Sequence, residues 1–295
     1  MDSKKNYTLI SEIGCNHQGD LQIAKKMMID ALNCGCKIVK FQKRTPKLQF
    51  SEEKYNSPHP TPENAFGETY GEHRENLEFS VAQHKELMLF AKENGLEYSC
   101  SIFDSQSTED ILSIQPEHIK IPSPINHRAD IIEHIAKNFN GIIHVSLGMT
   151  THEEERNLIN ILKKYNKLQD TILYHCVSAY PTEDKDASLL EITRLKNLYG
   201  NKIKALGLSA HHINSYLPDC IALTLGANYI ERHFTFDKAA KGSDHKISLN
   251  VEEMKNLNAE LKKTSQLLNF KQKEILDCEQ KTRQFHKDNF LKVTK

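Results

Sequence analysis

Two histidines, His211 and His233, each follow a short apolar stretch of the chain, in KALGLSAHH and YIERHF. Neutral imidazole rings are good ligands for borderline divalent metals. If the two stretches are neighbouring strands, both rings lie at the same edge of a sheet and could hold one ion. The chain contains 15 histidines, so a metal site needs support from the residues around this pair.

Other residues that could do chemistry recur where apolar segments end. Lysines and hydroxyls that converge suit a phosphate or a carboxylate, and a histidine pair suits a metal that polarises a carbonyl or holds a water. Together they indicate metal-assisted chemistry on a phosphorylated, anionic small molecule. The candidates for catalysis or substrate binding are Glu12, Lys40, Ser101, Lys120, Ser123, Ser146, Ser178, Ser209 and Glu231.

Eight short apolar segments alternate with longer amphipathic ones, and we interpret the short segments as strands. They cover residues 8–14, 38–42, 97–103, 118–122, 141–148, 171–176, 204–209 and 229–234. Eight β-then-α units are typical of a (β/α)8 TIM barrel, whose active site lies at the carboxyl ends of the strands. An open doubly wound sheet usually has fewer strands, and no Gly-rich phosphate loop follows the first strand here.

Two regions interrupt the alternation of strands and helices. Residues 43–79 form a long polar loop, and loops of that length in a compact domain are usually lids or binding loops. Residues 264–295 form a polar, linker-like or helical tail after a barrel domain that we assign to residues 1–263.

The composition excludes several classes of protein. Lys+Arg and Asp+Glu both number 39, which gives no support for a nucleic acid or an anionic membrane as the partner. No apolar run reaches the roughly 20 residues needed to span a bilayer, and the N-terminal residues lack a signal-peptide core. The seven cysteines are odd in number and form no CxxC pair, so neither a disulfide framework nor a zinc ribbon is indicated. We therefore expect a soluble, cytoplasmic protein.

Several motifs, in order from about residue 8 to residue 263, resemble the N-acetylneuraminate (sialic acid) synthase family. They are EIGCNHQGD, HIKIPS, HVSLGMT, LYHCVSAYPT, GLSAHH and IERHFTFDKAAKGSDH. The resemblance implies a (β/α)8 barrel that condenses phosphoenolpyruvate with the aldehyde of an open-chain amino sugar. The products are phosphate and a 3-deoxy-2-keto-nonulosonic acid.

The resemblance also implies roles for individual residues. His211 and His233 would hold a divalent ion, Mn²⁺ or Mg²⁺, and Tyr180 and Asp244 would lie near the sugar acceptor. One of two carboxylates would orient or deprotonate the attacking water, and the sequence does not choose between them. They are Glu12 and Glu231, and the phosphoenolpyruvate contacts fall on Lys40, Ser101, Lys120, Ser123, Ser146 and Ser209.

Three departures from the family pattern concern the acceptor half of the site. The usual Gly-Ser-Gly-Glu reads Pro-Ser-Pro-Ile, so Ile125 replaces a glutamate, and the usual Leu-Ser-Asp-His has Ala210 in place of the aspartate. Residues 278–290 resemble the linker to a C-terminal antifreeze-like domain, which we do not find in the chain. We expect an altered acceptor, less polar at the edge that Ile125 would face.

Two other interpretations stay open. A non-catalytic relative could act as a binding subunit beside another protein, and family members are commonly homodimers. Alternatively, the chain could be a different phosphoenolpyruvate aldolase, of the deoxy-sugar phosphate type, which shares the fold and cofactor. An acceptor that carries its own phosphate would require additional Arg or Lys side chains. Lys43, Arg44 and Arg74 in the long loop are candidates.

Overall fold

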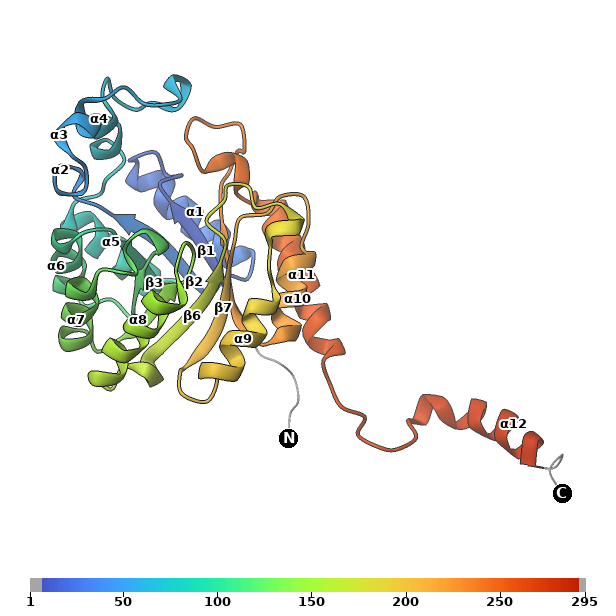
Figure 1. Cartoon of the computed structure of the whole chain (residues 1–295). Coiled ribbons are helices and arrows are strands. Elements are labelled where there is room, and N and C mark those ends of the chain that lie inside the picture. The colour runs from blue at the N-terminus through green and yellow to red at the C-terminus, as the bar shows by residue number, and fades with distance from the viewer. Residues whose placement is uncertain (1–6, 292–295) are drawn as a thin grey trace.

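Eight parallel strands close into a barrel in the order of the sequence, β1 to β8. The computed structural model describes residues 7–291, and side chains up to Lys287. The predicted (β/α)8 barrel is confirmed (Figure 1). The strands are β1 (Thr8–Gly14), β2 (Ile38–Lys43), β3 (Glu97–Ile102), β4 (His118–Ile121), β5 (Ile142–Ser146), β6 (Thr171–Cys176), β7 (Ala205–Ala210) and β8 (Ala227–His233).

Helices cover the outside of the barrel and bury its apolar outer face. Several begin at a side-chain cap and end at a residue that suits a helix C-terminus. Asp20 accepts hydrogen bonds from two amides of the first turn of α1, and Gly226 ends α10 with a φ of 114° that favours glycine. The outer helices are α1 (Leu21–Asn33), α5 (Val81–Glu93), α6 (Ser105–Ser113), α7 (Ala129–Asn138), α8 (His152–Lys164), α9 (Leu190–Tyr199), α10 (Leu217–Leu225) and α11 (Val251–Leu267).

The alternation of side chains along each strand decides which residues reach the barrel interior. In β2, Lys40 and Gln42 point inward, while Phe41 packs in the core between strands and helices. The strand register then sets inward residues side by side, because Glu12 pairs with both Lys40 and His233. In the same way Ser101 is level with Lys120 and Ser209 with Glu231. Charged groups from different strands therefore meet at one height in the barrel.

Residues 44–79, which we call the insert, are partly helical, so the prediction of a plain polar loop was incomplete. The insert contains α2 (Pro46–Gln49), α3 (Glu52–Asn56), the 3₁₀ turn η1 (Pro62–Asn64) and α4 (Tyr70–Glu75). Figure 1 shows it above the carboxyl end of the strands. Short helices with few apolar residues give little periodic signal, and these are held by local caps such as the Thr69–Glu72 capping box.

After α11 the chain leaves the barrel. Figure 1 shows α12 (Gln280–Leu291) away from it, and the aromatic rings of Phe270 and Phe285 on this arm are exposed. Among residues 7–291, no helix combines the length and apolar character that crossing a membrane requires.

Candidate active site

A polar cavity of about 170 Å³ opens at the carboxyl ends of the strands. It brings together every site residue predicted from the sequence except Ser178. The predicted residues that line it are Glu12, Lys40, Ser101, Lys120, Ser123, Ser146, Tyr180, Ser209, His211, Glu231, His233 and Asp244.

Two buried lysine–glutamate pairs form the floor of the cavity. The Nζ of Lys40 lies 2.5 Å from Oε2 of Glu12, and the Nζ of Lys120 lies 2.8 Å from both carboxylate oxygens of Glu231. The two pairs touch, since Lys40 Nζ is 3.6 Å from Glu231 Oε1. All four side chains are almost fully buried, and a buried charge is tolerated only when it is paired.

Opposite charges favour the ionised forms of Glu231 and Lys40. Burial alone would raise the pKa of Glu231, but the charges of Lys120 and Lys40 lower it well below its usual range. Burial likewise opposes the charge of Lys40, and Glu12 and Glu231 raise its pKa. Burial lowers the pKa of Lys120 despite Glu231. Lys120 is therefore the member of the cluster that depends most on its partner for its charge.

Serine hydroxyls surround the charged floor. Ser101 accepts a hydrogen bond from Lys40 at 2.9 Å, and Ser209 donates one to Glu231 at 2.9 Å. Ser123 accepts from the backbone amide of Gly148 at 3.1 Å. A Cβ at Gly148 would come within 2.7 Å of Ser123 Oγ and 2.3 Å of Ser178 Oγ. Ser178 thus packs against this loop and does not line the cavity.

His211 and His233 lie together on the cavity wall, with ring centroids 5.6 Å apart. Because Nδ1 of His211 donates to the Val177 carbonyl at 2.9 Å, its Nε2 keeps a free lone pair. Burial, and then the neighbouring His233, lower the pKa of His211 to about 3. The buried Nδ1 of His233 has no hydrogen-bond partner and lies 4.0 Å from Oδ2 of Asp244.

These two imidazoles suit a divalent metal, because His211 is neutral and His233 has an unsatisfied buried nitrogen. No cluster of three or more His, Cys, Asp or Glu side chains within residues 7–291 forms a complete metal site. The protein would supply two ligands, and water or substrate would complete the coordination shell.

A buried network behind the wall fixes the strand ends that carry the histidines. Arg232 lies between Glu231 and His233 in sequence and points to the outside of β8. Its Nη1 donates to Asp219 Oδ2 at 2.7 Å, and its Nη2 donates to the carbonyl of His212 at 2.7 Å. The ends of β7 and β8 are thereby tied to α10.

The structure corrects the prediction for Ile125. Its side chain is 6% exposed and belongs to the hydrophobic core, because the 3₁₀ turn η2 (Ser123–Ile125) directs it away from the cavity. Pro122 and Pro124 form that edge of the cavity instead. Ala210 also packs in the core, since the alternation of β7 turns Ser209 and His211 inward and Ala210 outward.

Gln42, Arg44 and Arg74 also line the cavity but were not among the site residues assigned from the sequence. The alternation of β2 would have placed Gln42 beside Lys40, and its Nε2 donates to Glu12 at 2.7 Å. The two arginines belong to the insert, whose path has no strand or helix periodicity to predict it. Lys43, the third cation considered, turns away from the cavity.

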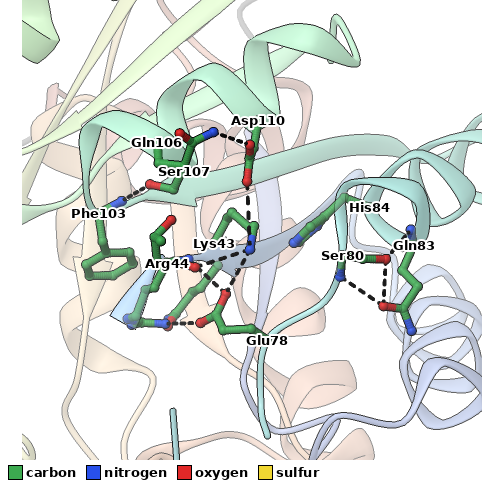
Figure 2. A network of polar contacts seen from close by, with 12 residues as sticks. Lys43, Arg44, Glu78, Ser80, Gln83, His84, Phe103, Gln106, Ser107 and Asp110 are labelled. Carbon is green, nitrogen blue, oxygen red and sulfur yellow. Dashed lines mark hydrogen bonds and ion pairs between the residues drawn. The ribbon is translucent and has the colours of Figure 1, made fainter. Parts of the chain in front are cut away.

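Lys43 instead joins the network at the base of the insert (Figure 2). Its Nζ lies 3.8 Å from Glu78 and 3.9 Å from Asp110. Glu78 also accepts from the backbone amide of Arg44 at 2.8 Å. This network holds the two ends of the insert against the barrel.

Residues 27–273 match the model described as NeuB family. The chain is 38% identical over 267 residues to the N-acetylneuraminate-9-phosphate synthase of Drosophila melanogaster, covering 89% of this chain and 68% of that protein. It is 32% identical to the N,N'-diacetyllegionaminic acid synthase of Legionella pneumophila, covering 92% and 76%. Among solved structures, the N-acetylneuraminic acid synthetase of Leptospira borgpetersenii in complex with citrate superposes on this chain with a TM-score of 0.81. The two sequences are 26% identical, and the superposition covers 96% of this chain and 92% of that chain.

Proposed function

The chain belongs to the NeuB family of synthases, which condense phosphoenolpyruvate with a sugar to form nonulosonic acids, and we propose that its residues divide this reaction between two parts of one cavity. The lysine–glutamate floor binds phosphoenolpyruvate, and the histidine wall receives the sugar aldehyde. The observation that carries the proposal is the meeting of two buried lysines, a serine ring and two histidines in a single cavity.

Phosphoenolpyruvate has a phosphate and a carboxylate, and both suit the floor. Lys40 and Lys120 supply charge in a site shielded from water, where electrostatic attraction is strong. Ser101, Ser123 and Ser209 supply directional hydrogen bonds, and Ser146 lines the same cavity. Fixing both anionic groups positions the enol carbon for attack on the aldehyde.

His211 and His233 would hold Mn²⁺ or Mg²⁺, with Asp244 beside them. When bound, such an ion polarises the aldehyde oxygen and stabilises the negative charge that develops on it. Tyr180 packs on the His211 ring, with centroids 4.2 Å apart. It limits the directions from which the acceptor can approach.

The contacts of the two glutamates suggest which one activates water. Glu231 accepts from Lys120 and Ser209 and has a lowered pKa, which makes it a poor proton acceptor. Glu12 has a hydrogen bond from Gln42 and an ion pair with Lys40, and it is level with His233. We therefore assign the activation of the attacking water to Glu12. Glu231 instead positions Lys120.

The test measures phosphate release from phosphoenolpyruvate with Mn²⁺ and a panel of C4–C6 aldoses, N-acylhexosamines and their phosphate esters. We expect release that depends on an acceptor and yields a keto acid containing the carbons of both substrates. Lys120→Met should abolish it, and Lys25→Met, which removes a lysine from the outer helix α1, should not. A folded protein that binds phosphoenolpyruvate but releases no phosphate with any acceptor would contradict the proposal.

A further inference from the structure

The barrel interior contains a continuous series of hydrogen bonds between four polar side chains, which we call the interior network. Its members come from the successive strands β3, β4, β5 and β6, and they are Glu97, His118, His144 and Tyr174. None of the four lines the cavity. The interior of such a barrel is usually filled by branched apolar side chains, and buried polar groups are costly unless they are satisfied. Packing alone does not account for a complete polar network at this place.

The interior network runs from the amino-terminal end of the barrel to the floor of the cavity. Glu97 and His118 are the first residues of their strands, and Nε2 of His118 lies 2.8 Å from Oε2 of Glu97. Nδ1 of His118 lies 2.9 Å from Nε2 of His144, and Nδ1 of His144 lies 2.7 Å from the hydroxyl of Tyr174. Of the four side chains, Glu97 is half-exposed and the other three are buried.

The hydrogen bonds of the interior network all point the same way. The hydrogen bond from His118 lowers the pKa of Glu97 and keeps it ionised, so this carboxylate accepts and Nε2 of His118 donates. The buried hydroxyl of Tyr174 needs an acceptor, which Nδ1 of His144 provides. Burial lowers the pKa of His144 and keeps its ring neutral, so its Nε2 donates to His118. Each side chain thus fixes the tautomer or the orientation of the next one, starting from the carboxylate.

The upper end of the interior network meets Lys120. The Nζ of Lys120 lies 4.0 Å from the centre of the Tyr174 ring, a distance at which the face of an aromatic ring attracts a cation. The Tyr174 ring also stacks on the His144 ring, at 5.6 Å between centroids. A Cβ at Gly207 would come within 2.4 Å of the Tyr174 ring, so β7 leaves the space that the ring occupies. The ring is thereby held in one orientation by its hydroxyl, by His144 and by the backbone of β7.

Lys120 needs this contact because its charge is opposed by burial. Burial lowers the pKa of Lys120, Glu231 raises it, Lys40 lowers it further, and Cys176 raises it. Glu231 is shared with Lys40, which lies 3.6 Å from the same carboxylate. The face of the Tyr174 ring therefore adds an attraction for the ammonium group that Glu231 alone does not supply.

We propose that Tyr174 is a positioning residue for Lys120. The rest of the interior network, from Glu97 through the two histidines, holds the Tyr174 ring in place. The ring keeps the ammonium group charged and directed at phosphoenolpyruvate, so a carboxylate at the opposite end of the barrel acts on the cavity floor. This inference rests on the proposed function, because it gives Lys120 the task of binding that substrate.

The experiment measures phosphoenolpyruvate binding by calorimetry, without an acceptor, between pH 7 and pH 10. Tyr174→Leu removes the aromatic face, which favours neutral Lys120, so the alkaline decline of binding should begin about one pH unit lower than in the wild type. Above that pH, binding should be about 10-fold weaker. Tyr174→Phe keeps the ring and loses its hydrogen bond, so it should restore most of the affinity and remain about threefold weaker than the wild type.

A second set of variants tests the far end of the interior network. Glu97→Gln should weaken binding about threefold at alkaline pH, and it should have no further effect in Tyr174→Phe, because Glu97 acts through the hydroxyl. Glu109→Gln is the matched control. Glu109 pairs with His134 at 2.9 Å on the outer helices, and its loss should leave binding within about 1.5-fold.

The outcomes separate this inference from the proposed function. A variant that is merely less stable would lose Tm without a shift in the alkaline decline. An unchanged decline in Tyr174→Leu, or wild-type binding in Tyr174→Phe if the leucine variant does not fold, would overturn the positioning role while phosphate release by the wild type upheld the function. A shifted decline in a protein that releases no phosphate with any acceptor would support the positioning role and contradict the function. A wild type that does not bind phosphoenolpyruvate would overturn both.

Discussion

Replacement of Glu231 by glutamine is the most informative test of the cavity floor. The change keeps the size and shape of the side chain but removes the charge that Lys120 contacts at 2.8 Å through both oxygens. Lys120 is 2% exposed, so water cannot replace the lost partner. Lys40, at 3.6 Å from Glu231, loses a secondary partner but keeps Glu12.

The expected loss of stability follows from the cost of an unpaired buried charge. Removing one member of a buried ion pair costs about 3–5 kcal/mol. Lys120 can avoid that cost by releasing its proton, because burial already lowers its pKa. The double variant Lys120→Met/Glu231→Gln has no unpaired charge at this position, so we expect it to recover about half of the loss or more.

Proton release by Lys120 gives the variant a distinctive pH dependence. In the folded variant Lys120 is neutral, while in the unfolded chain it binds a proton up to its ordinary pKa of about 10.4. The unfolded state therefore binds more protons, and stability rises with pH in that window. Relative to the wild type, the deficit should shrink by about 1.4 kcal/mol per pH unit between roughly pH 7 and pH 9.

The assay is chemical and thermal unfolding of the wild type, the two single variants and the double variant at several pH values. For a chain of this size, about 3–5 kcal/mol corresponds to a fall in Tm of roughly 5–15 °C. A deficit in Glu231→Gln that does not change with pH, or a double variant less stable than Glu231→Gln, would refute the charge pairing that we infer.

Three further predictions concern the metal, acid stability and the strand ends. His211→Ala should weaken Mn²⁺ binding, measured by calorimetry, by about 10-fold or more. Chelation of divalent ions should stop phosphate release until Mn²⁺ is added back, and activity that survives chelation would contradict the metal proposal. Burial lowers the pKa of both His17 and His84 from 6.5 to about 3. The unfolded chain therefore takes up protons first as the pH falls below about 6.5, and each residue should reduce the free energy of unfolding by about 2 kcal/mol between pH 7 and pH 5. The Tm of His84→Gln should fall less steeply with acid than that of the wild type, and an equal slope would refute this origin of the acid sensitivity. Asp219→Ala leaves Arg232 buried without its carboxylate and should cost roughly 3–5 kcal/mol, together with weaker Mn²⁺ binding, whereas an unchanged Tm would show that the network is dispensable.

The periodic elements could be predicted from the sequence because each strand is a short apolar run with polar residues at its carboxyl end. The register then determines which of those residues meet, as with Glu12 and Lys40. Ser178 and Ile125 were misplaced for a local reason. Both follow a strand end in a turn, where the direction of a side chain depends on backbone angles and not on alternation.

The residues of the insert could not be placed from the sequence for a different reason. The sequence identified Lys43, at the end of β2, and Arg44 and Arg74 of the insert as cations, but it did not show which of them faces the cavity. Adjacent residues Lys43 and Arg44 point to opposite sides, and Arg74 comes back to the cavity across α2 and α3. That return depends on tertiary packing such as Tyr55 against Gly71, where a Cβ would meet the ring at 2.3 Å.

The closure of the insert at its base has a consequence for how the mouth of the cavity could change. Glu78, near the end of the insert, accepts a hydrogen bond from the amide of Arg44 at its start, so the segment between them is a loop whose two ends are held together. The entropy of closing such a loop grows only with the logarithm of its length. Residues 45–77 could therefore be exchanged for a segment of another length or charge while β2, Lys40 and the floor stay in place. The fold thus separates a fixed cavity floor from a segment at the mouth of the cavity that could vary independently of it.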